Sequence, residues 1–166
     1  GVKRENVWLC DIHGLVYKGR TTDMNPSKAA FAQPSELRTL DDVIAGADLF
    51  LGLSGPGVLT SDQVKQMSVQ PIIFALANPM PEILPDLARA AAPNAIIATG
   101  RSDFPNQVNN VLCFPFIFRG ALDVRATAIN DEMKVAAVEA LRAITKEPVP
   151  ESVLAASNSK SLTFGK

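Results

Sequence analysis

Residues 71–78 read PIIFALAN, a run of apolar side chains followed at once by Pro79. Similar runs occur at residues 6–11 (NVWLCD), 49–54 (LFLGLS) and 95–100 (AIIATG). Each run is almost continuously apolar, as is typical of strands whose two faces are both covered. The four runs therefore predict parallel β-strands buried between layers of helices.

The segments between these runs carry signals for helices. Thr39 and Thr60 each precede a segment with acidic residues near its start, the pattern of an N-capping residue and a first helical turn. Residues 85–91 begin with a proline, which a first helical turn tolerates. Strands that alternate with helices are joined by right-handed crossovers. We therefore predict an α/β fold, with a doubly wound, mostly parallel, Rossmann-like sheet and helices on both faces.

The last part of the chain departs from this alternation. Residues 106–126 are largely apolar but contain Pro115 and Gly120, which predicts a broken helix. Residues 130–145 (NDEMKVAAVEALRAIT) have apolar side chains at helical spacing, which predicts a longer amphipathic helix with one face packed on the domain. Beyond it, residues 148–166 become rich in serine and alanine, and we interpret them as a C-terminal extension or linker.

Composition limits the classes of protein that fit. The chain has 166 residues, 47% of them hydrophobic, with 16 basic and 17 acidic residues and a formal net charge of −1. One globular domain, over residues 1–147, accounts for most of that length. No basic stripe or membrane-length apolar run is present, so nucleic acid and membrane are not expected partners. Cys10 and Cys113 stand in apolar runs and are expected to be reduced and buried, which favours a cytoplasmic protein.

Candidate binding residues follow the predicted strands, where open α/β sheets bind ligands. Asp11 closes the first run, and its carboxylate suits the hydroxyls of an adenosine ribose. Ser54 and Gly55 begin the turn SGPG, in which the missing Cβ of glycine lets the backbone approach a ligand closely. Each of these sites also fits an ordinary turn.

Three asparagines are further candidates. Asn78 stands in a proline-braced turn, and Asn109 and Asn110 open the apolar segment. An amide side chain both donates and accepts, which suits a hydroxy acid or a carboxamide, although Asn-Pro is a common turn and backbone groups can satisfy buried amides. The single histidine, His13, is expected in a loop, and no metal-ligand or nucleophile pattern is visible.

The phosphate-binding motif of a dinucleotide domain is missing. No Gly-x-Gly-x-x-Gly occurs in the sequence, although such a domain carries it after the strand that precedes the ribose-binding acidic residue. If Asp11 is that acidic residue, this strand and its loop would precede residue 1. We therefore expect a domain that lacks its first strand and phosphate loop and leaves a sheet edge exposed.

Four stretches resemble, in order and spacing, the NAD(P)-binding domain of bacterial malic enzymes. They are residues 11–20 (DIHGLVYKGR), 50–57 (FLGLSGPG), 73–82 (IFALANPMPE) and 98–126, of which the last is the most specific. Residues 148–151 (PVPE) and 162–165 (LTFG) are similar to the segment that follows this domain in the longer bacterial forms.

The resemblance implies an enzyme that oxidatively decarboxylates L-malate to pyruvate and carbon dioxide with NAD or NADP and Mg or Mn. The family's catalytic tyrosine and lysine and its metal-binding acidic residues precede the region present here, so the resemblance implies no catalytic residue and no metal ligand in this chain. The isolated chain is expected to be inactive. Many members of the family assemble, so a homo-oligomer is expected.

The resemblance also assigns roles to individual residues. It implies that Asp11 contacts the adenosine ribose, while Lys28 would face a 2′-phosphate in an NADP form, with a surface lysine as the default interpretation. It further implies a dinucleotide site lined by Ser54 and Gly55, and contacts to nicotinamide or malate from Asn78, Asn109 and Asn110.

Two other classes of function remain open. Another NAD(P)-dependent dehydrogenase, such as one acting on amino acids, is disfavoured by the Asn109-Asn110 pair and the run GRSD at residues 100–103. A non-catalytic fragment or interaction module stays possible because the phosphate loop is missing.

Overall fold

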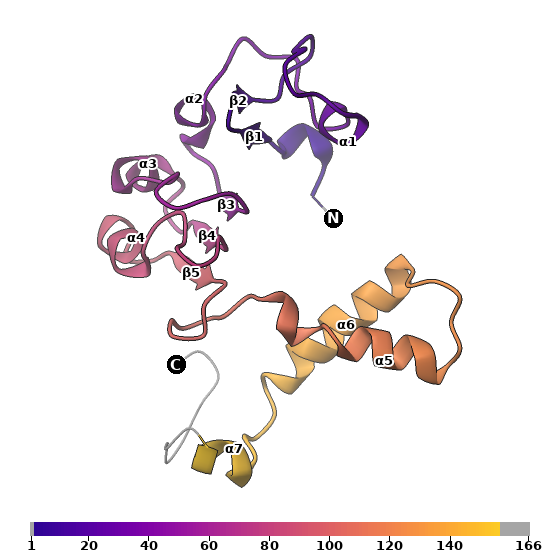
Figure 1. Cartoon of the computed structure of the whole chain (residues 1–166). Helices are drawn as coiled ribbons and strands as arrows, with labels where there is room; N and C mark the ends of the chain where they lie inside the picture. Colours follow the sequence, from indigo (N-terminus) through magenta and orange to yellow (C-terminus); the bar gives the residue numbers. More distant parts are fainter. Residues whose placement is uncertain (1, 157–166) are drawn as a thin grey trace. The chain divides into compact units, whose positions relative to one another are not determined.

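The computed structural model describes residues 2–156 (Figure 1). The chain divides into two compact units, Gly1–Val108 and Asn109–Lys166, which we call unit 1 and unit 2. The sequence did not indicate this boundary, and the predicted domain limit at residue 147 stays a prediction. The end of the predicted extension, residues 157–166, lies outside the described residues, and so does the LTFG stretch at 162–165.

Unit 1 contains a three-stranded parallel sheet in the order β3-β4-β5 (Figure 1). The strands are β3 (Leu49–Gly52), β4 (Ile72–Ala75) and β5 (Ile96–Thr99), each inside one of the predicted apolar runs. The Rossmann-like α/β class is therefore confirmed.

Three helices connect or precede these strands: α2 (Leu40–Ile44), α3 (Ser61–Gln66) and α4 (Pro85–Ala91). The predicted capping residues are confirmed. The side chains of Thr39 and Thr60 each accept a hydrogen bond from the backbone N–H of the third helical residue, and the side chain of that residue accepts one from the threonine N–H. Such reciprocal capping satisfies two backbone donors that a helix would otherwise leave unpaired.

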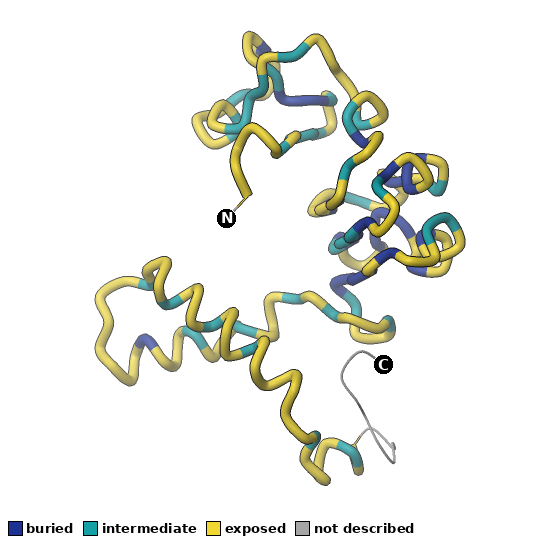
Figure 2. Tube along the Cα trace, turned by 180° about the vertical axis from the view of Figure 1, so that it is seen from behind, coloured by how far each residue is buried: buried dark blue, intermediate teal, exposed yellow. Residues whose placement is uncertain are grey.

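The core of unit 1 lies on one face of the sheet. Phe50, Ile73 and Ile97 are neighbours in the strand register and are all buried. Val64 of α3 and Ala88 of α4 belong to the same buried cluster. Figure 2 shows buried positions gathered around this sheet and its helices.

The opposite face of the sheet is apolar and only partly covered in the described chain. Leu49, Leu51 and Ile96 alternate with the core residues and are 47%, 51% and 58% exposed. The described residues leave these three side chains uncovered, and a second layer of helices over this face stays a prediction. The strand order explains it: β3, β4 and β5 follow one another in one direction, so right-handed crossovers place α3 and α4 on the same side.

The first apolar run does not join this sheet, contrary to prediction. Within residues 6–11 only β1 (Cys10–Asp11) is extended and paired, and it forms an antiparallel hairpin with β2 (Gly14–Leu15). The hairpin closes locally because the carboxylate of Asp11 accepts from the His13 N–H and Gly14 adopts a φ of 92°, which glycine tolerates. The short helices η1 (Arg4–Asn6) and α1 (Pro26–Ala29) flank the hairpin in sequence and were not predicted.

Unit 2 is helical, with η2 (Asn110–Leu112), α5 (Phe116–Asp123), α6 (Asp131–Ile144) and α7 (Glu151–Ala156). The predicted broken helix is confirmed as η2 and α5, separated before Phe116, although residues 106–109 are not helical. The predicted long helix is confirmed as α6. Its face that packs against α5 is narrow, and most of unit 2 is exposed (Figure 2).

Within the described chain, no helix combines the length and apolar character that crossing a membrane requires.

We expect Ile73→Ala to destabilise the protein by about 2–5 kcal/mol, because it removes a fully buried side chain from the central strand and leaves a cavity. Urea denaturation measures the change. Val69→Ala is the control, since Val69 is 87% exposed and its truncation should cost less than about 0.5 kcal/mol. Equal losses in the two variants would contradict this placement of the core.

Candidate functional site

Three loops meet at the edge where the parallel strands end. Ser54 and Gly55 follow β3, Asn78 follows β4, and Gly100 follows β5. Parallel strands bring their carboxyl ends to one edge, so the structure places the predicted residues Ser54, Gly55 and Asn78 at the same side of the sheet. Their ligand-binding roles stay predictions.

The loop after β3 has space for a ligand. At Gly55, no heavy atom beyond its chain neighbours lies within 4 Å of the position that a Cβ would take. Gly57, two residues on, has a φ of 72°, a conformation that side chains disfavour. Both glycines therefore keep the backbone of this loop uncovered.

Glu82 links the loop after β3 to the loop after β4, and the sequence analysis did not single it out. Its side chain is fully buried. Oε1 accepts from the Ser54 N–H at 2.8 Å, and Oε2 accepts from the Ala77 N–H at 3.1 Å. The signal that would have found it is an acidic residue between Pro81 and Ile83 in an otherwise apolar stretch after a strand.

Arg101 links the loops after β4 and β5. Its guanidinium donates to the backbone oxygen of Pro79 at 3.1 Å and holds Asp103 through bonds of 2.7 and 2.5 Å. Hydrogen bonding from Arg101 lowers the pKa of Asp103. Arg101 thus braces the turn that carries Asn78, whose peptide bond to Pro79 is cis.

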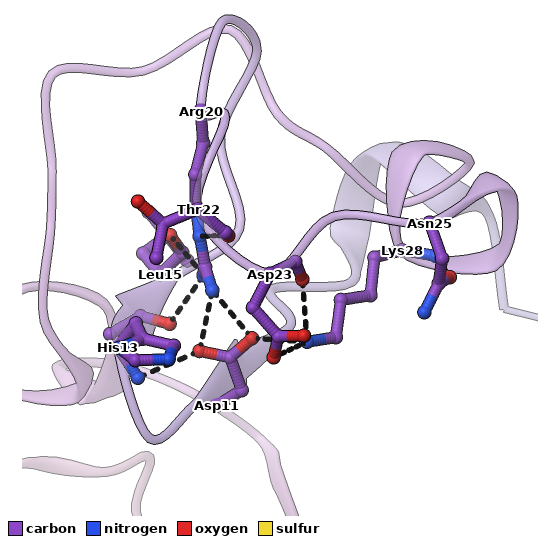
Figure 3. A network of polar contacts seen from close by, with 9 residues as sticks. Asp11, His13, Leu15, Arg20, Thr22, Asp23, Asn25 and Lys28 are labelled. Carbon is purple, nitrogen blue, oxygen red and sulfur yellow. Dashed lines mark hydrogen bonds and ion pairs between the residues drawn. The ribbon is translucent and has the colours of Figure 1, made fainter.

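Asp11 lies at the end of β1, within a cluster of charged side chains rather than at the sheet edge (Figure 3). Arg20 Nη2 donates to both carboxylate oxygens, at 2.8 and 2.6 Å. Lys28 Nζ lies 2.7 Å from Oδ2 of Asp11 and also pairs with Asp23 at 2.5 Å. Lys28 keeps a partly exposed side chain, 20% accessible, and pairs with two carboxylates; whether it also meets a 2′-phosphate stays a prediction.

Hydrogen bonds and charges within this cluster shift the pKa values of its members. Burial alone would raise the pKa of Asp11, but the hydrogen bonds from Arg20 and Lys28 outweigh it and hold that pKa well below its usual range. The hydrogen bond to Asp11 raises the pKa of Lys28. Burial, followed by the charge of Asp11, raises the pKa of the Cys10 thiol to about 11. Asp11 is therefore ionised at neutral pH and already satisfied by protein donors.

The predicted residues Asn109 and Asn110 lie at the start of unit 2. The side-chain oxygen of Asn109 accepts from the Val111 N–H at 3.0 Å, so Asn109 caps η2, while Asn110 is exposed. Because Asn78 belongs to unit 1, the expected grouping of the three asparagines around one ligand stays a prediction.

Cys10 and Cys113 are free and only partly buried, so the expectation that both are buried is wrong. Across residues 2–156, no three His, Cys, Asp or Glu side chains come together as a metal site would require.

Comparison with known proteins gives consistent matches. Residues 2–156 match the family model described as the malic enzyme, NAD binding domain. The chain is 55% identical over 166 residues to the NADP-dependent malic enzyme of Halomonas elongata, covering 100% of this chain and 39% of that protein. It is 56% identical over 165 residues to the NAD-dependent malic enzyme of Rhizobium meliloti, covering 99% of this chain and 21% of that protein.

A solved structure agrees with these matches. The crystal structure of the NAD-dependent malic enzyme from Thermotoga maritima superposes with a TM-score of 0.67 at 40% identity, covering 83% of this chain and 37% of that one. The chain thus spans well under half the length of these relatives.

We expect Asp11→Asn to destabilise the protein at pH 7 by about 1.5–3 kcal/mol, because hydrogen bonds to a charged group are lost. The lowered pKa of Asp11 means that its stabilising effect is complete above the unfolded-state pKa of about 3.9 and is lost as pH falls through the folded-state value. The gap between wild type and variant should therefore narrow only below about pH 4. Urea denaturation between neutral and acidic pH measures it.

The control for this pH series is Asp48→Asn, which changes an exposed carboxyl in the same unit. A stability gap for Asp11→Asn that widened on acidification would contradict the ion-pair assignment.

Proposed function

The chain belongs to the malic enzyme family, as its NAD-binding domain, and we propose that the intact protein oxidatively decarboxylates L-malate to pyruvate and carbon dioxide. The observation that carries the proposal is the family match across residues 2–156, with open loops at the end of a parallel sheet. The activity belongs to the whole protein, and this chain supplies the positions for cofactor and substrate. By itself the chain is expected to be inactive.

We propose that the dinucleotide lies across the ends of β3 and β4. Gly55 lets its backbone approach the cofactor, and the hydroxyl of Ser54 lies in the same loop. The exposed amide of Asn78 can both donate to and accept from the nicotinamide carboxamide or malate. Ser54, Gly55 and Asn78 would hold and orient the dinucleotide and malate, and the nicotinamide would supply the acceptor for a hydride.

The adenosine end of the cofactor is proposed to lie at Asp11. Its carboxylate accepts from the partly exposed side chain of Lys28, and a ribose hydroxyl can replace this donor. Lys28, released from Asp11, would then be placed to meet a 2′-phosphate. This favours NADP, although relatives of both cofactor types show similar identity.

We propose that Asn109 and Asn110 contact the substrate in the intact enzyme. Their amides suit the hydroxyl and carboxylate groups of malate.

Mg or Mn is proposed to bind through residues of the parent protein outside this chain, where it would polarise the carbonyl of the keto acid before decarboxylation. The parent enzyme is further proposed to be a cytoplasmic homo-oligomer.

The test is an assay of the intact protein with L-malate, Mn²⁺ and either NAD or NADP, with reduction of the cofactor followed by absorbance. Malate-dependent reduction with formation of pyruvate supports the proposal. A folded intact protein that neither reduces nor binds either cofactor would refute it and favour an interaction module. Reduction driven by an amino acid instead of malate would point to the other dehydrogenase class.

Lys28→Gln should lower kcat/KM for NADP by about tenfold, since it removes a charged contact to phosphate. The same variant should leave kcat/KM for NAD within about threefold, because NAD lacks that phosphate. The matched control is Lys65→Gln, which removes an exposed lysine of α3 paired only with Asp62. A parallel loss with both cofactors would count against a 2′-phosphate contact.

A further inference from the structure

Glu82 holds both ends of the loop that follows β3. Its carboxyl oxygen Oε1 accepts from the N–H of Ser54, where the loop begins, at 2.8 Å. Its backbone oxygen accepts from the N–H of Leu59, where the loop ends, at 3.2 Å. One residue from a different part of the chain therefore fixes the start and the finish of the segment that contains Gly55.

The second carboxyl oxygen extends this link to the neighbouring loop. Oε2 accepts from the N–H of Ala77 at 3.1 Å, and Ala77 directly precedes Asn78. Ala77 and Glu82 are buried, whereas Ser54 and Asn78 are exposed. The buried carboxyl group thus connects the two loops whose exposed residues are Ser54 and Asn78.

The sequence of β3 leaves room for this carboxyl group. A Cβ at Gly52 would stand 2.3 Å from Cδ of Glu82, much closer than real atoms approach. A buried polar group costs free energy unless it is hydrogen-bonded, and both oxygens of Glu82 are. No salt bridge among the described residues involves Glu82, so its partners are the two backbone amides and, at 3.5 Å, the Ser54 hydroxyl, and not a countercharge.

We propose that Glu82 is a positioning residue that sets the distance between the Ser54–Gly55 turn and Asn78 and thereby sets the affinity of the enzyme for its dinucleotide. This inference rests on the proposed function. Glu82 does not itself touch the cofactor: it acts through the backbone of the residues that do.

Glu82→Gln is the sharpest variant because it preserves size and shape. A carboxyl group offers acceptors at both oxygens, whereas an amide has one oxygen and one NH₂ donor. In the variant, an NH₂ group must face either the Ser54 N–H or the Ala77 N–H, so one of the two links is lost. Glu82→Asp keeps both acceptors but is one methylene shorter, so it cannot reach both amides from the same backbone position.

The experiment uses the intact enzyme. The dissociation constant of NADP is measured by calorimetry, the cofactor KM and kcat by steady-state assay, and Tm by thermal unfolding. Glu82→Gln should raise both the dissociation constant and the KM by about tenfold, the cost of one buried hydrogen bond, with a smaller change in kcat. Amide exchange at Ser54 and Ala77 should become faster. The matched control, Glu36→Gln, alters a fully exposed carboxyl in the same unit and should change none of these values.

Gly52→Ala provides an independent route to the same effect, because its new Cβ would displace the carboxyl group of Glu82. If both substitutions act on one link, the double variant should bind NADP about as weakly as Glu82→Gln alone. Should Gly52→Ala fail to fold, Glu82→Gln still decides the question.

The outcomes separate this inference from the proposed function. If wild type binds NADP and Glu82→Gln binds it within about twofold of wild type, the positioning role is wrong even though the enzyme stands. A lower Tm with an unchanged dissociation constant has the same meaning, because a merely structural residue alters how much protein is folded and not how tightly the folded protein binds. If the wild-type enzyme binds no dinucleotide, both proposals fail.

Discussion

Parallel hydrogen bonding between β3, β4 and β5 is the constraint on which the candidate site depends. It forces three loops that are distant in sequence to begin at one edge of the sheet. Ser54 and Asn78 become neighbours in the fold because the strands before them are paired in register. The same constraint explains why Glu82, in the loop after β4, can reach the backbone after β3.

Features governed by local sequence were predictable. Apolar runs predicted the strands of the sheet, and Thr39 and Thr60 predicted the starts of α2 and α3. Each of these depends on residues within one or two turns of the chain. The resemblance to a known family added the residues of the binding loops, and the family itself is confirmed.

Features that depend on distant parts of the chain were not predictable in this way. Strand order decides which face the helices cover, and a sequence of apolar runs does not contain it. Residues 6–11 are apolar enough for a central strand, but a strand pairs with the neighbouring strand that the fold makes available. Here the positive φ of Gly14 allows β2 to fold back on β1. The ion pair between Lys28 and Asp11 could not be predicted for a similar reason, since the two residues are far apart in sequence and close in space.

The two carboxyl groups of the candidate site differ in what holds them, and this difference separates binding from positioning. Asp11 is held by Arg20, which is itself buried and bonded to backbone oxygens, and by Lys28, a partly exposed side chain whose rotatable bonds let it move aside for a ligand. Glu82 is held by backbone amides at the ends of strands, which cannot turn away without disturbing the sheet. A ligand can therefore compete for Asp11 but not for Glu82. Asp11 is therefore suited to exchange partners when the cofactor binds. Glu82 is suited to keep the loops in place during binding.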